Sequence, residues 1–206
     1  MNNTMKLQKI KDLGRIEARK ILSGELTRRK PGSIVHLFHG NSPSEHSTSI
    51  KFGKFGETMA KNMINNTDGL ELLQCGCRNI GDGVNKDFDL IWIGKDGEIF
   101  YRELKGNLEL DTEKLPSMIK KINNNIRPYL HREYPGKTID IGILYWSVYD
   151  RCDLGSRCST QIRKCENNDI KVENMSGFIE TINFEWEKDD FYSYFLSLGQ
   201  LFNNPQ

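Results

Sequence analysis

The sequence predicts an α/β fold in which helices flank a mixed central sheet. Two apolar, β-branched and aromatic runs at residues 88–93 and 98–105 surround a glycine-containing turn, which is typical of a β-hairpin. A nearly continuous apolar run at 139–148 predicts a strand that is buried on both faces of the sheet. Apolar residues at helical spacing predict the flanking helices at residues 53–65, 111–130 and 189–202.

The remaining elements follow from the same patterns. Residues 6–26 carry apolar side chains at near-helical spacing with lysines and arginines between them, which predicts a basic amphipathic helix, broken near Gly14. Residues 27–49 are rich in Arg, Lys, Pro, Gly, Ser and His, a composition typical of a loop. The paired asparagines at 65–66 close the helix that begins at residue 53. A short strand is expected near 170–172.

The length of 206 residues favours a single domain with one core. Residues 1–50 would form the basic helix and loop, 52–148 the core, and 149–206 a C-terminal elaboration with a closing helix. No apolar run approaches the roughly 20 residues of a membrane span. The N-terminus has no apolar segment followed by a small-residue cleavage site, so we expect a cytoplasmic protein.

The five cysteines are odd in number and occur in a chain without an export signal, which favours reduced thiols over disulfides. A zinc site is the alternative. Their spacings, C-x-C and C-x5-C-x6-C, do not form the paired C-x2-C motifs of common zinc folds, so unliganded thiols are the preferred interpretation. The cysteines are Cys75, Cys77, Cys152, Cys158 and Cys165.

The net charge of +1 hides an uneven distribution along the chain. Residues 1–61 hold 12 Lys and Arg against 5 Asp and Glu, whereas the other 145 residues hold 17 against 23. The basic first third can contact the phosphates of a nucleic acid, although a solvated basic helix explains any single lysine equally well.

The hairpin turn predicts which polar residues face one another. If Gly94 pairs with Glu98, each cross-strand pair sums to 192 in residue number, so Asp89 lies opposite Glu103 and Asp87 opposite Lys105. These polar side chains would share one face of the hairpin. The opposite face would be the buried one, with Phe88, Leu90, Trp92, Phe100 and Leu104.

Two facing carboxylates repel one another unless a cation lies between them, and Mg²⁺ binds carboxylate oxygens readily. A nearby lysine can position or deprotonate a water that attacks a phosphodiester. Solvent-facing charges are the alternative, because D-x13-E-x-K occurs by chance in many chains. The position of Asp89, Glu103 and Lys105 at the ends of apolar strands favours the site.

This pattern resembles the PD-(D/E)xK nuclease superfamily through Asp89 and the E-x-K of Glu103, Leu104 and Lys105. The preceding F-G-E-T-M-A-K is similar to the family's first helix and places Glu57 at its glutamate. The match covers residues 52–107, with Phe88 where the family often has proline. It implies catalytic roles for Asp89, Glu103, Lys105 and Glu57, and a Mg²⁺ site formed by Asp89, Glu103, Leu104 and Glu57.

Two alternatives remain for these acidic positions. Asp87 or Asp82 could take the role of Asp89, and a glutamate in a first helical turn such as Glu57 is also favoured by the helix dipole. No P-loop or dinucleotide fingerprint is present, so no nucleotide cofactor is expected.

S-P-S-E-H-S-T-S-I-K-F-G-K and E-L-K-G-N-L-E-L-D-T-E-K are similar to stretches of type II restriction endonucleases, including type IIS enzymes and their small catalytic subunits. The resemblance implies a Mg²⁺-dependent, sequence-specific double-stranded DNA endonuclease. A structure-specific resolvase or repair nuclease, and a catalytic subunit that cuts only with a larger recognition partner, are the alternatives. A homodimer is the simplest way to cut both strands. DNA contacts are expected from Arg28, Arg29, Lys30, Ser42, Ser44, Lys51 and Lys54.

Overall fold

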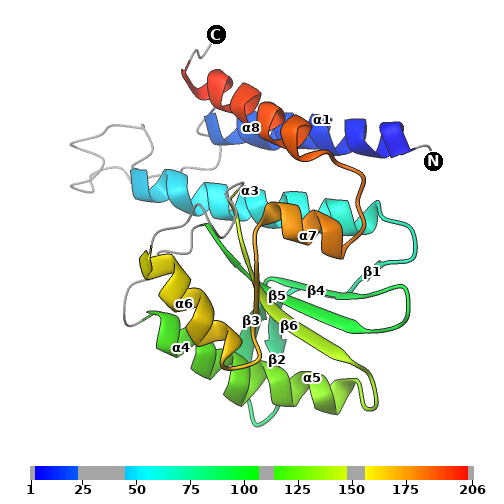
Figure 1. Cartoon of the computed structure of the whole chain (residues 1–206), viewed down its shortest axis with the longest axis vertical. Coiled ribbons are helices and arrows are strands. Elements are labelled where there is room, and N and C mark those ends of the chain that lie inside the picture. The colour runs from blue at the N-terminus through cyan, green and yellow to red at the C-terminus, as the bar shows by residue number, and fades with distance from the viewer. Residues whose placement is uncertain (1–2, 23–44, 107–113, 148–155, 204–206) are drawn as a thin grey trace. The chain divides into compact units, whose positions relative to one another are not determined.

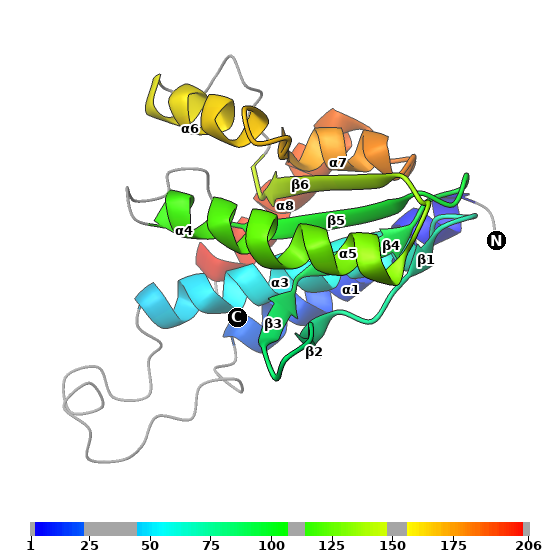
Figure 2. The same ribbon diagram turned by 90° about the horizontal axis from the view of Figure 1, so that it is seen from below.

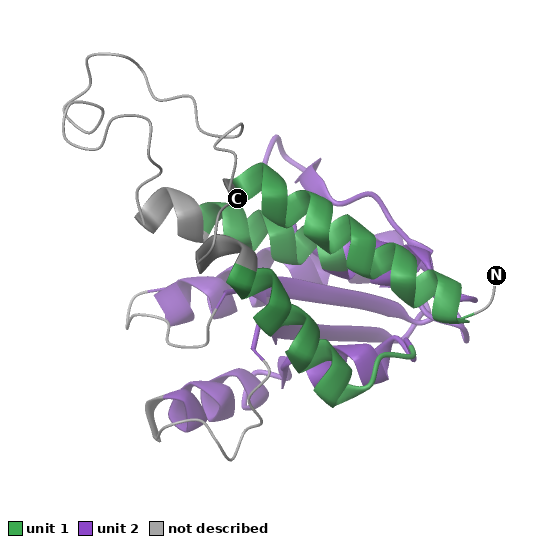
Figure 3. Cartoon of the chain, turned by 90° about the horizontal axis from the view of Figure 1, so that it is seen from above, with its two compact units in different colours: residues 1–59, 185–206 green, residues 60–184 purple. Residues whose placement is uncertain are grey.

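A computed structural model of the chain describes residues 3–22, 45–106, 114–147 and 156–203. The chain divides into two compact units (Figure 3). Unit 1 comprises residues 1–59 and 185–206, and unit 2 comprises residues 60–184. None of the described helices is both long and apolar enough to cross a membrane.

Unit 2 is built on a five-stranded mixed sheet with the order β1-β4-β5-β6-β7 (Figure 1). The β1–β4 and β4–β5 pairs are antiparallel, whereas β5–β6 and β6–β7 are parallel. The predicted mixed sheet flanked by helices is therefore confirmed. The strands are β1 (Glu71–Leu72), β4 (Leu90–Ile93), β5 (Ile99–Lys105), β6 (Ile139–Tyr145) and β7 (Lys171–Glu173).

The β4–β5 hairpin has the register that its turn predicts. Leu90 pairs with Arg102 and Ile93 with Ile99, so the pairs sum to 192 as expected. The Gly94 N–H donates to the Glu98 carbonyl at 2.9 Å, and the Gly97 N–H donates to the Gly94 carbonyl at 3.0 Å. Gly97 has φ +83°, the left-handed conformation that glycine adopts without steric cost.

The chain before Asp89 departs from the predicted hairpin. β2 (Gly76–Asn79) and β3 (Asn85–Phe88) form a separate two-stranded sheet in which Asp87 pairs with Cys77. The prediction that Asp87 lies opposite Lys105 is therefore wrong, because the chain bends between β3 and β4 and a new pairing begins at Leu90.

The bend also changes the face that Phe88 occupies. Its ring packs edge-on against Tyr101 at 5.6 Å and Tyr129 at 5.2 Å, rather than beside Leu90 and Trp92 as expected. Alternation of side chains holds only along a continuous strand, and the strand is interrupted at Asp89.

Helices cover both faces of the sheet. α4 (Lys114–Lys121), the π-helix η1 (Ile122–Ile126) and α5 (Arg127–Glu133) follow one another along one face (Figure 2), joined by α6 (Ser156–Glu166) in a common core with Ile91, Tyr101 and Ile143. On the other face, Phe178 of α7 (Met175–Thr181) packs edge-on against Trp92 at 5.9 Å. The expectation that only one face of the hairpin is buried was therefore wrong, because helices pack against both of its faces.

Most predicted elements of unit 2 are present with shifted ends. The 139–148 strand ends at Tyr145, the 170–172 strand runs one residue later, and the 111–130 helix continues to Glu133. Residues 111–113 and 148 lie outside the described residues. β1, β2, α6 and α7 were not predicted, because their apolar patterns are short or interrupted by polar residues.

Unit 1 contains α1 (Asn3–Leu22), the first part of α3 (Glu45–Asn65) and α8 (Lys188–Asn203). α3 begins at Glu45 rather than at residue 53, so the predicted loop at 27–49 is wrong for residues 45–49, whose polar sequence carries no apolar periodicity. It ends at Asn65 as predicted. Lys11 pairs with Asp190 at 2.6 Å, and the Tyr194 hydroxyl donates to the Lys11 carbonyl at 2.7 Å. α8 begins one residue before the predicted 189.

The predicted break at Gly14 is wrong, because α1 is continuous there. A Cβ at this position would overlap the hydroxyl of Tyr194 and lie 3.2 Å from Met59. Gly14 therefore permits close packing of helices within unit 1 rather than a change of backbone direction.

Candidate active site

Asp89 lies in the bend between β3 and β4, beside the end of β5. Its Oδ2 atom accepts a hydrogen bond of 2.7 Å from the backbone N–H of Leu104. The carboxylate thus bonds the strand that carries Glu103 and Lys105, at the position next to the last regular pair of Leu90 with Arg102. This contact holds the Asp89 side chain at the strand end where the hairpin register predicted it.

Glu103 is almost completely buried, with 6% of its surface exposed, and three side chains donate to it. The Tyr101 hydroxyl lies 2.5 Å from Oε2, and Lys121 Nζ lies 2.8 Å from the same oxygen. Lys105 Nζ lies 2.9 Å from Oε1. Both carboxylate oxygens are therefore engaged, each by one lysine.

Glu103 is close enough to Asp89 for its negative charge to act on that carboxylate. Burial, followed by the negative charge of Glu103, raises the pKa of Asp89 to about 6. The Leu104 N–H and the two lysines act in the opposite direction and do not cancel these effects. Asp89 therefore takes up its proton as the pH falls through about 6, well above the ordinary range of an aspartate.

Burial acts on Glu103 as well, but Lys105 and Lys121 outweigh it and hold the pKa of Glu103 below its ordinary value. Burial, and then the Glu103 charge, raise the pKa of Tyr101 well above its usual range, so its hydroxyl stays a proton donor to Glu103. The site thus combines an ionised glutamate with an aspartate whose charge is unfavourable.

Tyr101 and Lys121 were not among the predicted site residues. Tyr101 could have been found, because residues two apart on a strand share a face and Glu103 is two residues further on. Lys121 gave no such signal. It is the last residue of α4, and its contact with Glu103 depends on how that helix packs on the sheet.

The two alternatives to Asp89 lie elsewhere. Asp87 is exposed and paired with β2, although its charge contributes to the raised pKa of Tyr101. Asp82 is exposed in the turn between β2 and β3, with φ +50°. Of the three aspartates, Asp89 is the one whose carboxylate accepts a hydrogen bond from the strand that carries Glu103.

The other predicted site residues belong to unit 1 or lie outside the described residues. Glu57 belongs to unit 1, where it pairs with Lys54 at 2.8 Å, so its role in the site stays a prediction. Lys51 is buried, with 8% of its surface exposed, whereas the Lys54 side chain is 71% exposed. Five predicted DNA contacts lie outside the described residues: Arg28, Arg29, Lys30, Ser42 and Ser44.

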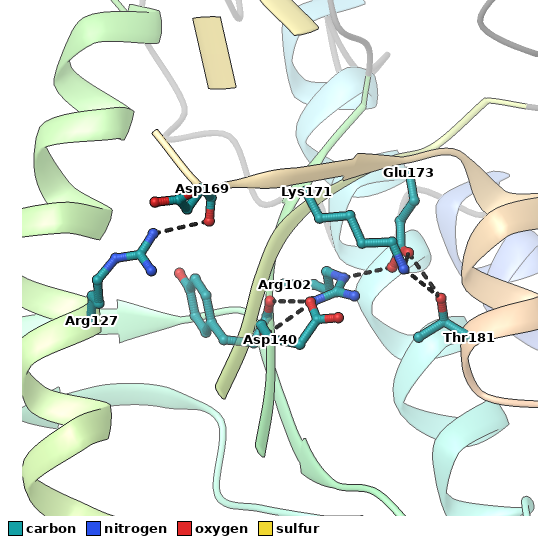
Figure 4. A network of polar contacts seen from close by, with 8 residues as sticks. Arg102, Arg127, Asp140, Asp169, Lys171, Glu173 and Thr181 are labelled. Carbon is teal, nitrogen blue, oxygen red and sulfur yellow. Dashed lines mark hydrogen bonds and ion pairs between the residues drawn. The ribbon is translucent and has the colours of Figure 1, made fainter. Parts of the chain in front are cut away.

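A buried ion network supports β5 from the opposite face of the sheet (Figure 4). Arg102 is completely buried and donates at 2.6 Å to both Glu173 and Asp140. Its guanidinium also lies over the rings of Trp92 and Phe100. Burial raises the pKa of Glu173, but Arg102 and Lys171 outweigh it and lower that pKa overall.

This network starts from the residue of β5 that directly precedes Glu103. Arg102 joins β5 to Asp140 on β6 and Glu173 on β7, and the next residue along β5 is Glu103. A Cβ at Gly142 would lie 3.0 Å from the Arg102 side chain and 2.9 Å from the Lys171 carbonyl. Glycine at this position leaves room for the buried guanidinium.

The described cysteines do not form a cluster with other metal-binding side chains. Cys77, Cys158 and Cys165 are free thiols, and the Cys75 thiol donates to the Leu73 carbonyl at 3.4 Å. Burial raises the pKa of Cys165 to about 11. Cys152 lies outside the described residues. Within the described part of the chain, no three or more His, Cys, Asp or Glu side chains gather as a metal site.

The Asp89–Glu103 pair nevertheless suits Mg²⁺. This ion commonly takes one or two protein carboxylates and completes its coordination with water and substrate phosphate. Burial, and then the charge of Glu103, make ionisation of Asp89 unfavourable even with Lys105 and Lys121 nearby. A divalent cation would supply further positive charge, so the donor set fits.

No protein-family model matches the chain, and no curated protein matches it.

Proposed function

We propose that the chain is a Mg²⁺-dependent, sequence-specific double-stranded DNA endonuclease with a PD-(D/E)xK core, of the type II restriction class. One observation carries the proposal: Asp89 and Glu103 meet at one end of a hairpin, with Lys105 in contact with Glu103. An aspartate, then Glu-x-Lys on the adjacent antiparallel strand, is the arrangement that the sequence resemblance implies.

In this proposal Asp89 and Glu103 would hold the metal, with the Leu104 backbone beside them. The bound ion would neutralise charge on the scissile phosphate and lower the pKa of a coordinated water. Lys105 Nζ positions the attacking water and keeps Glu103 ionised. The Tyr101 hydroxyl and the Leu104 N–H orient the two carboxylates, and the Arg102 network holds β5 from behind.

The decisive experiment compares purified wild-type protein with Asp89→Asn, Glu103→Gln and Lys105→Met on unmethylated plasmid and phage DNA. The reactions contain either Mg²⁺ or EDTA. Wild type should give discrete bands with Mg²⁺ alone, and each variant should lose at least about 100-fold in cleavage rate, as expected when a group acting in the transition state is removed. Asp82→Asn, which alters an exposed turn, should cut like wild type.

Circular dichroism and thermal unfolding check that the inactive variants remain folded. Full activity in any one of the three site variants contradicts the assignment. If wild type leaves every linear and plasmid substrate intact, the same reactions with four-way junctions, or with a larger recognition subunit added, separate the two alternative nuclease classes from one another.

A further inference from the structure

Lys121 is a second lysine at the proposed metal site, supplied by a helix rather than by the E-x-K strand. Its ammonium lies 2.8 Å from Glu103 Oε2, while Lys105 occupies Oε1. The Lys121 side chain is 23% exposed and that of Glu103 is 8% exposed, so the contact is largely shielded from water. The Coulombic attraction between two charges is screened less in such a shielded pair than at the surface.

The formal charges of the cluster sum to zero without any metal, although both lysines bond Glu103, whereas Asp89 accepts from a backbone N–H. Asp89 and Glu103 supply two negative charges when ionised, and Lys105 and Lys121 supply two positive charges. A divalent cation would leave an excess of two positive charges in a site with little water. Entry of the cation is therefore opposed unless one lysine moves away or a phosphate arrives.

The local backbone places Lys121, and not its neighbour, at this position. Lys121 ends α4, and the π-helix Ile122–Ile126 follows it directly. Short π segments are rare inside helices, and those that do occur often lie at functional sites. Lys120 is exposed and lines a pocket together with Lys164 and Asn123.

We propose that Lys121 is a positioning residue that competes with a divalent cation for Oε2 of Glu103. Without the cation, Lys121 compensates the buried carboxylate and holds it in place. With the cation, Lys121 leaves Glu103 and its ammonium becomes available to the DNA phosphate. This inference rests on the proposed metal-dependent nuclease function and assigns Lys121 a role separate from that of Lys105.

The first test measures Mg²⁺ affinity by calorimetry in the absence of DNA, for wild type, Lys121→Met, Lys121→Arg and Lys120→Met. Removal of a charge-assisted contact that opposes binding should tighten Mg²⁺ affinity in Lys121→Met on the order of tenfold. Lys121→Arg keeps the charge and should stay close to wild type. Lys120→Met removes the same charge one residue away and should also stay close to wild type.

The second test needs no substitution at Lys121. Acetylation of wild type by a succinimidyl ester, read by tandem mass spectrometry, should be slow at Lys121 and should rise when Mg²⁺ is added. Lys120, in the same peptide, should not change. In Glu103→Gln the acetylation of Lys121 should already be fast without Mg²⁺.

The outcomes separate this inference from the proposed function. An equal rise in Mg²⁺ affinity in Lys120→Met and Lys121→Met would indicate a general effect of removing positive charge, and it would overturn the proposed competition. An unchanged Mg²⁺ affinity in Lys121→Met would overturn it as well. Acetylation of Lys121 that does not respond to Mg²⁺ also overturns it, while the nuclease proposal stands. Failure of wild type to bind Mg²⁺ with or without DNA overturns both.

Discussion

At the scale of single residues, the two carboxylates of the site have pKa shifts of opposite sign: that of Glu103 is lowered and that of Asp89 is raised. Glu103 has two lysines and a tyrosine as donors, so its charge is compensated. Asp89 accepts from a backbone N–H and has its pKa raised to about 6 by burial and by Glu103. If a cation binds as we propose, these unequal environments predict that it is attracted chiefly by Asp89.

The raised pKa of Asp89 predicts how the free energy of unfolding depends on pH. Its folded pKa of about 6 lies above the ordinary value of about 3.9 in unfolded chains, so the folded state binds the proton more tightly. The resulting stabilisation is complete below pH ~4 and is lost as pH rises through ~6. In Asp89→Asn this loss should be absent.

Urea unfolding at pH 4.5, 5.5 and 6.5, with EDTA present, measures the effect. The free energy of unfolding of Asp89→Asn should rise relative to wild type across this range. Asp82→Asn serves as the control, because Asp82 is exposed at a positive φ that asparagine tolerates. If the free energies of unfolding of Asp89→Asn and wild type differ by the same amount at all three pH values, the raised pKa of Asp89 is refuted.

At the scale of elements, two glycines within helices differ in how much space surrounds them. In α1, a Cβ on Gly14 would meet the Tyr194 hydroxyl, which is held by its bond to the Lys11 carbonyl, and the side chain of Met59. In α3, a Cβ on Gly53 would meet no atom of the described chain within 4 Å. Helix propensity favours alanine at both positions.

Alanine substitutions at these glycines should therefore have opposite effects. Gly53→Ala should stabilise the protein by about 0.5–1 kcal/mol, because alanine loses less backbone entropy than glycine in a helix. Gly14→Ala should destabilise it by about 1–3 kcal/mol through overpacking. Thermal and urea unfolding of the two variants provide the comparison, and stabilisation by Gly14→Ala would show that α1 does not pack as described.

At the scale of the whole molecule, the basic character of the first 61 residues predicts a strongly salt-dependent affinity for DNA. Replacement of Arg28, Arg29 and Lys30 by serine should weaken binding. It should also reduce the slope of log affinity against log salt by about 3, since each phosphate contact contributes about 0.9. Fluorescence anisotropy with a labelled duplex, in a Glu103→Gln background that prevents cleavage, gives both quantities.

The control replaces Lys95 and Lys137, which are exposed near the β4–β5 turn, at the opposite end of the hairpin from Asp89 and Glu103. These substitutions should leave the affinity and its salt slope unchanged. An equal effect of both sets would indicate nonspecific attraction rather than contacts from residues 28–30.

The sequence by itself determined the parts of the site that depend on local chemistry. The glycines at 94 and 97 specify the turn, and the turn specifies the pairing that sets Asp89 beside the Glu103 strand. Hydrophobic periodicity likewise predicted the helices at 53–65, 111–130 and 189–202, because a helix that faces a core needs a continuous apolar side.

Only the tertiary structure decided the remaining contacts. They join segments that are far apart along the chain, and no local sequence pattern indicates which distant segments meet. The pairing of β3 with β2 removes Asp87 from the hairpin. The packing of α4 brings Lys121 to Glu103, 18 residues away, and the assembly of β5, β6 and β7 brings Glu173 to Arg102, 71 residues away. Such contacts depend on helix rotation and strand order, which local propensities do not encode.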